Sequence, residues 1–249
     1  CGTPRSAAEP DPVYSRPTME PADADPAPGT GAHELEAIYA TRFGARTDAR
    51  TVLWQTLVTS YFQQFIRPTD TVLDLAAGYC EFINTVRCGT KIAVDLNPTV
   101  NTVAGPDVTV HHRASTDLPA ELTGTVDVAW VSNFFEHLAD SAELLATLRE
   151  LRRVLKPGGR LLVLQPNIRL TGAAYWDFVD HSLPITERSL AEALSLTGFT
   201  VETMKVRFLP YTTESRLPIS PTLIRLYLKL PPAQFLLGKQ TFVVARASA

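Results

Sequence analysis

The chain has 249 residues, of which 45% are hydrophobic and 20% are charged, and its formal net charge is −3. This composition can bury a complete core, so we expect one large domain or one and a half domains. The slight negative charge gives no basic field for nucleic acid, and no apolar run approaches the roughly 20 residues that a membrane-spanning helix needs. The composition therefore disfavours nucleic-acid partners and integral membrane proteins.

The cysteines Cys1, Cys80 and Cys88 are odd in number and lack the spacing of a metal site. That usage fits a reducing cytosol better than a disulfide framework, so we expect a cytoplasmic location. An amino-terminal cysteine also begins processed lipoproteins, but no signal segment supports that interpretation here.

Residues 1–31 are crowded with Pro, Ala, Asp and Thr and have no periodic apolar face, which predicts a disordered tail. Apolar residues at helical spacing then predict two helices over 32–66, ahead of the first strand. These helices either form a lid over the site, with Tyr39, Arg42 and Phe43, or simply pack against the sheet. We expect a single domain over 32–249.

The stretch TVLDLAAGYCE, residues 71–81, organises the rest of the chain. Val72, Leu73 and Leu75 predict a buried parallel strand, small residues surround Gly78, and EFINTVR has helical character. Such a loop lets backbone N–H groups approach a ligand, and the positive end of the following helix attracts a carboxylate or a phosphate. The stretch therefore predicts a binding place for a charged small molecule.

Strands and helices alternate after this stretch. Strands are predicted to end at Asp95, near residue 111 and near Ser132, and a fifth strand follows the Gly158–Gly159 turn. Helices are predicted after Asp140 or Ser141 and after Thr186, and the strands FTVETMKVRF and QTFVVARA complete the order. The predicted fold class is α/β: a Rossmann-like, doubly wound, seven-stranded sheet, mostly parallel with an antiparallel last strand.

Residues 209–238 form an insertion before the last strand, in which Ser220 and Pro221 begin an apolar helix. Packed inward, the insertion caps the acceptor site, which is the interpretation we prefer. Left exposed, residues 220–237 would contact a membrane surface, a lipid-linked acceptor or a second subunit of a homodimer.

Ligands of open α/β sheets bind outside the carboxyl ends of the strands, so the residues after each strand belong together. A carboxylate at the end of the second strand accepts both hydroxyls of a ribose, which suits Asp95. The loop at Thr116 and Asp117 would meet an adenine edge, and Leu96 would cover the adenine face. The polar residues at these ends are Asp74, Asp95, Thr116, Asp117, Ser132, Asn133, Glu136 and His137.

The sequence resembles the class I S-adenosylmethionine-dependent methyltransferases, in particular the type 11-like group with an acidic-x-Gly-x-Gly loop. The segments VLDLAAGYCEF, IAVDLNP, RASTDLP, DVAWVSNFFEHL and LRRVLKPGGRLLV occur in the order and spacing of that family. The resemblance implies S-adenosyl-L-methionine as the cofactor. It assigns the methionine part to Gly78 and the loop Ala76–Cys80, the ribose to Asp95, the adenine amino group to Asp117, and the cofactor's amino group to the Ser132–Asn133 backbone.

Two loop positions depart from the family, which usually has glycine where this chain has Ala76 and Cys80. A Cβ at Ala76 is tolerable if its φ angle stays negative, whereas the Cys80 side chain would lean into the pocket. We expect cofactor binding to survive in weakened form.

Methyl transfer to a hydroxyl needs alignment and a base, and the candidate catalytic residues are His137 and His181. Structural roles are equally compatible with the pattern: a helix start at Glu136–His137 and a hydrogen-bonded loop histidine at His181. Asp177 and Asp180 could orient an imidazole. Glu136, His137, Asp180 and His181 could also hold Mg²⁺ or another divalent ion, but the spacing is not diagnostic, and we assign no metal from the sequence.

These features predict an S-adenosylmethionine-dependent methyltransferase that methylates an oxygen of a small-molecule, sugar or glycan-type acceptor, as in natural product biosynthesis. A dinucleotide-binding oxidoreductase is the first alternative, since Asp95 would serve it equally well, but the glycine fingerprint and a Tyr-x-x-x-Lys pair are missing. A binding protein that kept the fold and lost catalysis is the second.

Overall fold

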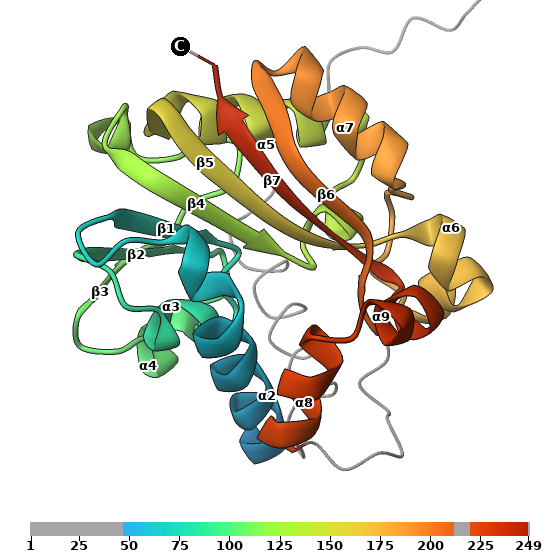
Figure 1. Cartoon of the computed structure of the whole chain (residues 1–249). Coiled ribbons are helices and arrows are strands. Elements are labelled where there is room, and N and C mark those ends of the chain that lie inside the picture. The colour runs from blue at the N-terminus through green and yellow to red at the C-terminus, as the bar shows by residue number, and fades with distance from the viewer. Residues whose placement is uncertain (1–46, 212–219, 249) are drawn as a thin grey trace, which may run out of the picture.

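The computed structural model describes residues 47–211 and 220–248, and these form one sheet with helices on both faces (Figure 1). The predicted tail 1–31, the first predicted helix and the lid residues Tyr39, Arg42 and Phe43 lie outside the described residues. The lid therefore stays a prediction.

The sheet has seven strands in the order β3-β2-β1-β4-β5-β7-β6. Strands β1 to β5 run parallel, and β7 is antiparallel to both β5 and β6. The strands are β1 (Thr71–Leu75), β2 (Thr90–Val94), β3 (Val108–His111), β4 (Val126–Ser132), β5 (Leu155–Pro166), β6 (Phe199–Leu209) and β7 (Gln240–Ala247). The predicted fold class is confirmed, and the strand order reverses between β1 and β4, where an open α/β sheet has its ligand crevice.

Capping side chains determine where the two helices α5 and α7 begin. Asp140 caps α5 by accepting a hydrogen bond from the Glu143 amide, and Thr186 forms a capping box with Ser189 at the start of α7. The α-helices are α2 (Thr47–Ser60), α3 (Glu81–Thr85), α4 (Val100–Val103), α5 (Ser141–Val154), α6 (Ile168–Thr171), α7 (Glu187–Leu196), α8 (Pro221–Leu228) and α9 (Pro231–Leu237). Short 3₁₀ turns are η1 (Phe62–Phe65), η2 (Ala120–Leu122), η3 (Phe135–His137) and η4 (Gly172–Asp177).

The two faces of the sheet carry separate hydrophobic clusters, because successive side chains of a strand point to opposite faces. Leu73 of β1 joins the cluster under α5 and α7, whereas its neighbour Val72 joins the cluster under α2 and α3. Trp130 of β4 lies fully buried in the second cluster, stacked on Phe82 of α3 with ring centroids 4.3 Å apart. The second cluster thus supports the helix that follows the β1 loop.

The insertion before β7 consists of two short helices instead of one. The predicted helix begins at Pro221 as expected, although the Ser220 side chain makes no capping hydrogen bond, and it ends at Leu228 because Pro231 starts α9. Helix α8 lies beside α2 (Figure 1). Leu226, Phe235 and Leu236 are exposed there. Within the described residues, the helices are too short or too polar to cross a membrane.

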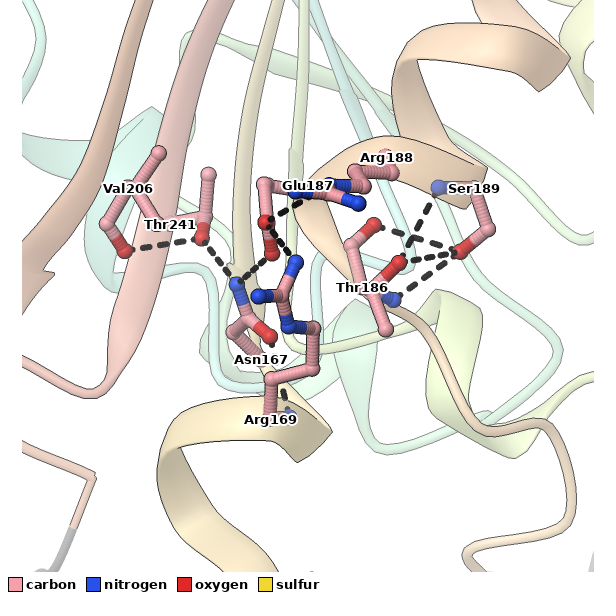
Figure 2. A network of polar contacts seen from close by, with 8 residues as sticks. All are labelled: Asn167, Arg169, Thr186, Glu187, Arg188, Ser189, Val206 and Thr241. Atoms are coloured by element: carbon pink, nitrogen blue, oxygen red, sulfur yellow. Dashed lines mark hydrogen bonds and ion pairs between the residues drawn. The ribbon is translucent and has the colours of Figure 1, made fainter.

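A polar network fixes both ends of the segment between β5 and α7 (Figure 2). The buried Asn167 side chain, directly after β5, donates to the Glu187 carboxylate at 2.7 Å and to the Thr241 hydroxyl at 3.1 Å. Thr241 of β7 in turn donates to the Val206 carbonyl of β6 at 2.9 Å. One amide therefore ties α7, β7 and β6 to the end of β5.

Asn167→Ala should lower the free energy of unfolding by about 2 kcal/mol, because it removes a buried hydrogen bond to a carboxylate and leaves its partners unsatisfied. Urea denaturation of the variant measures this loss. Asn101→Ala is the matched control, since the exposed Asn101 side chain contacts the exposed His112; it should change stability by less than about 0.5 kcal/mol. Equal losses in both variants would contradict the role of the network.

Candidate active site

The loop after β1 has left-handed backbone at three positions: φ is +55° at Ala76, +54° at Gly78 and +59° at Cys80. The amides of Ala76 and Ala77 both donate to the Val94 carbonyl, at 2.8 and 3.3 Å, which ties the loop to the end of β2. The condition that φ stays negative at Ala76 is therefore not met. The loop keeps a glycine-type conformation although two of its residues carry a Cβ, at a cost of about 1–2 kcal/mol each.

Cys80 packs into the core: its side chain is fully buried and belongs to the cluster that contains Phe82 and Trp130. Burial, followed by the neighbouring carboxylates of Asp74, Asp95 and Glu81, raises the pKa of the Cys80 thiol to about 12. The thiol is therefore neutral and contributes packing, and the expectation that it leans into the pocket is wrong.

Ala76→Gly should raise the free energy of unfolding by about 0.5–1 kcal/mol, because relief of the left-handed strain exceeds the extra freedom that glycine gives the unfolded chain. Cys80→Gly is the matched comparison at the same φ. It should give no gain, since it also removes a buried side chain. Thermal denaturation of both variants tests the pair, and a loss of stability in Ala76→Gly would show that the alanine conformation is unstrained.

Asp95 stands directly after β2, on the opposite side of the β1 loop from β4, and is 8% exposed. One carboxylate oxygen accepts the Gly78 amide at 2.8 Å, and the other accepts the Asn97 amide at 2.7 Å. Burial raises the pKa of Asp95, while these two hydrogen bonds oppose the rise. Each oxygen keeps a further lone pair, so the carboxylate can accept two more hydrogen bonds, as a ribose with two hydroxyls requires.

Asp74, in β1, is 3% exposed. Burial first, and then the charges of Asp95 and Glu81, raise its pKa well above the ordinary range of an aspartate. Glu81 itself pairs with Arg50 of α2. Because these carboxyl groups already raise the pKa of Asp74, a further anion such as a phosphate is disfavoured beside the loop, and a ligand with positive groups, such as a sulfonium and an ammonium, is favoured.

The remaining predicted cofactor residues follow β2, β3 and β4. Leu96 is 55% exposed beside Asp95, so its side chain is accessible to a flat apolar surface such as the adenine face. Thr116 and Asp117 are exposed after β3, and Asp117 pairs with Arg113 at 3.1 Å. At the end of β4, half-buried Ser132 precedes Asn133, whose φ is +48° and whose amide is bonded to the Leu164 carbonyl of β5 at 2.9 Å. The carbonyls of this corner, not the Asn133 amide, are thus available to an amino group.

The predicted catalytic histidines come together. His137 ends η3, directly after β4, and His181 lies in the segment between β5 and α7; their ring centroids are 5.0 Å apart. The Glu136 carbonyl accepts the amides of Ser182 and Leu183, at 2.8 and 3.1 Å, and so joins the two segments. Asp177 is exposed.

Side chains behind the histidine pair determine its electrostatics. His137 Nδ1 lies 3.1 Å from an Asp180 carboxylate oxygen and 3.2 Å from the Asp180 carbonyl, so Nδ1 carries a proton and donates it. Burial alone would lower the pKa of His137, but the Asp180 hydrogen bond and the charge of Glu136 bring it above the ordinary value. Glu136 is 1% exposed, and this burial raises its pKa.

Gln165 is also part of the site, although it was not predicted from the sequence. Its amide donates to the Glu136 carboxylate at 2.7 Å from the carboxyl end of β5, and it is 1% exposed. The signal was present: a polar residue interrupts the apolar run RLLVLQPN just before the strand ends. Buried glutamine at a strand's carboxyl end is expensive without a polar partner, which points to a site.

The doubly wound sheet with an antiparallel last strand, the loop after β1 and the carboxylate after β2 together define a class I S-adenosylmethionine-dependent methyltransferase. A family model described as a methyltransferase domain matches residues 46–204, and the chain belongs to that family. S-adenosylmethionine is the cofactor of the class.

The chain is also similar to one curated protein and to several solved structures. A 37.1 kDa uncharacterized protein of transposon TN4556 from Streptomyces fradiae is 32% identical over 136 residues, which are 50% of this chain and 36% of that protein; the match thus spans about a third of the relative's length. A S-adenosylmethionine-dependent methyltransferase from Archaeoglobus fulgidus has a TM-score of 0.59 at 17% identity, covering 85% of this chain and 99% of that one. The [4+2]-cyclase SpnF has a TM-score of 0.54 at 17% identity, covering 80% and 81%. These structural likenesses show the fold alone.

Proposed function

We propose that the protein transfers the methyl group of S-adenosylmethionine to an oxygen of a small-molecule, sugar or glycan-type acceptor. The observation that carries the proposal is the polar cluster of Glu136, His137 and His181 at the end of β4, next to the switch in strand order between β1 and β4; Glu136 and His181 are buried and His137 is half-buried. A cluster of this kind has no packing purpose that apolar residues would not serve better.

The charges around the β1 loop support this cofactor over a dinucleotide. Asp74, Asp95 and Glu81 surround the loop, so a pyrophosphate would meet like charges, whereas a sulfonium and an ammonium group meet opposite ones. Helix α3 has only five residues, and the acidic Glu81 lies in its first turn. Its positive end therefore offers little to a phosphate, which disfavours the dinucleotide-binding oxidoreductase.

The chain's own residues perform alignment and activation. S-adenosylmethionine supplies an electrophilic methyl group on its sulfonium. Asp95 and the loop Ala76–Cys80 hold the cofactor from the β1 and β2 side, while the β4 corner at Asn133 leads directly into η3. An acceptor hydroxyl then lies beside His137 and His181, which activate it for in-line attack.

Calorimetric titration with S-adenosylmethionine, S-adenosylhomocysteine and NAD tests the cofactor, and methyl incorporation from labelled S-adenosylmethionine into a panel of hydroxylated acceptors tests the reaction. We expect both sulfur compounds to bind, no response to NAD, and a mass gain of one methyl group on the acceptor. Binding of NAD without binding of the sulfur compounds would overturn the proposal. Binding of the cofactor with methyl transfer only to nitrogen or carbon would overturn its acceptor part.

A further inference from the structure

We propose that Glu136, His137 and His181 bind one divalent transition-metal ion of the zinc class, which holds and activates the acceptor oxygen. Two imidazoles and one carboxylate are a ligand set that such ions use in catalytic sites, where open positions remain for water or substrate. The inference rests on the proposed function for the role of the ion, but the binding of the ion stands independently of it.

The spacing of the side chains suits one ion. One ligand atom from each of the three residues lies within 4.8 Å of the others, and His137 Nε2 is 3.9 Å from a Glu136 carboxylate oxygen. Ligand atoms about 2.0–2.2 Å from a tetrahedral ion are about 3.5 Å apart. Side-chain rotations that move these atoms by about an ångström therefore complete the site without a change of the backbone.

Outer contacts hold two of the ligands in the orientation that an ion requires. Asp180 accepts the Nδ1 proton of His137, which leaves the Nε2 lone pair directed toward Glu136. Gln165 occupies the other carboxylate oxygen of Glu136, at 2.7 Å. Carboxylate–histidine–metal and hydrogen-bonded carboxylate arrangements of this kind orient metal ligands and tune their basicity.

The third ligand lies in an aromatic wall. The His181 ring is 8% exposed, and its centroid is 5.0 Å from those of Tyr175 and Phe178 and 6.5 Å from that of Tyr211. The backbone bonds from Ser182 and Leu183 to Glu136 keep this residue beside η3. The wall limits access of water to one side of the cluster, as a catalytic metal site needs.

Charge balance favours a cation. With neutral imidazoles the three ligands carry one negative charge, on a carboxylate that is 1% exposed. The neutral amide of Gln165 donates to one of its oxygens at 2.7 Å, and His137 Nε2 lies 3.9 Å from the other oxygen. A divalent ion would place positive charge directly against this buried carboxylate.

The open positions of the ion indicate the class of acceptor. An ion with three protein ligands binds a hydroxyl oxygen, and a neighbouring oxygen on the acceptor can fill a further position, as in vicinal diols and hydroxycarbonyl compounds. The ion lowers the pKa of the bound hydroxyl, whose proton leaves to water. The oxygen then forms its bond to the methyl carbon as the carbon–sulfur bond breaks, and the electron pair of that bond stays on sulfur. The imidazoles bind the ion instead of taking the proton.

Metal binding tests the inference directly. The full chain is stripped with a chelator and titrated with Zn²⁺ by calorimetry and with Co²⁺ by visible absorption, and the metal content before stripping is measured by mass spectrometry. We expect one equivalent of Zn²⁺ and a Co²⁺ spectrum typical of a low-symmetry, nitrogen-ligated site. Glu136→Gln and His181→Gln should each weaken binding at least tenfold, and Asp180→Asn by about 10–100-fold through the orientation of His137.

His112→Gln is the matched control, because this exposed histidine bonds to Asn101 at 2.6 Å, far from the cluster in the strand order. It should bind Zn²⁺ like the parent chain. Each variant is also titrated with S-adenosylhomocysteine, whose binding should persist with and without Zn²⁺. No stoichiometric Zn²⁺ binding by the parent chain, or equal binding by Glu136→Gln and His181→Gln, would overturn the inference. Failure of S-adenosylhomocysteine to bind the parent chain would instead overturn the proposed function.

Discussion

Asp95→Ala should weaken the binding of S-adenosylmethionine at least tenfold and on the order of a hundredfold. The proposed ribose contacts are two hydrogen bonds to a carboxylate, each worth about 1.5–3 kcal/mol, and about 1.4 kcal/mol corresponds to a factor of ten in affinity. The substitution also frees the Gly78 and Asn97 amides that the carboxylate now accepts, so the β1 loop loses one of its ties to the end of β2. Both effects act in the same direction.

Calorimetry with S-adenosylhomocysteine measures the loss, and two variants separate its causes. Asp95→Asn keeps an oxygen for one amide and one hydroxyl, so its loss should be smaller than that of Asp95→Ala. Asp107→Ala removes an exposed carboxylate that pairs with Lys91 at 2.9 Å, at the opposite end of the sheet, and should leave the affinity unchanged. Unchanged affinity in Asp95→Ala would show that the cofactor's ribose lies elsewhere.

The sheet was predictable because its signals are local. Short apolar runs predicted β1, β2 and β4, and end signals at Asp140 and Thr186 predicted α5 and α7; the structure has these elements within a residue or two. The antiparallel last strand was predicted because the segment before it offers no long crossover helix. The structure has the two short helices α8 and α9 there, and the pairing of β7 with β5 and β6 confirms the antiparallel direction.

The features that escaped prediction depend on contacts between distant segments. The positive φ at Ala76 arises from the hydrogen bonds that join the loop to β2, and an alanine at that position does not predict it. The break between α8 and α9 was readable at Pro231, whereas the packing of α8 on α2 was not. The Glu136–Gln165 bond joins the ends of two strands, and such partners emerge only when the register of the sheet is known.

The site was predicted only in part, because some of its residues follow strand ends and others depend on how a long segment folds back. The position of each polar residue after a strand placed Asp95 and His137 at one edge of the sheet, because parallel strands end together. The distance between His137 and His181 instead depends on how the segment after β5 folds back, which Asn167 fixes through Glu187 and Thr241. Sequence patterns do not predict how this segment folds back toward η3.

Trp130→Ala should lower the free energy of unfolding by about 3–5 kcal/mol, the largest loss expected for a single core substitution in the described chain. Trp130 is fully buried in β4, stacks on Phe82 at 4.3 Å, and meets the rings of Phe62 and Trp54 edge-on at 4.6 and 6.3 Å. Removal of the indole leaves a cavity that these rings cannot fill without leaving their own contacts. For a chain of this size the loss corresponds to a fall of roughly 6–20 °C in melting temperature.

The same substitution should also weaken cofactor binding, because Phe82, on which Trp130 stacks, belongs to α3, the helix that directly follows the β1 loop. Without the indole beneath it, α3 no longer holds the loop Ala76–Cys80 against β2, and binding of S-adenosylhomocysteine should weaken together with stability. Trp176→Ala is the matched control: this tryptophan is 51% exposed, so its loss should change the melting temperature by only a few degrees. Normal cofactor affinity in a destabilised Trp130→Ala would mean that the loop is held by its bonds to Val94 and Asp95 alone, and that the core beneath α3 serves stability without shaping the site.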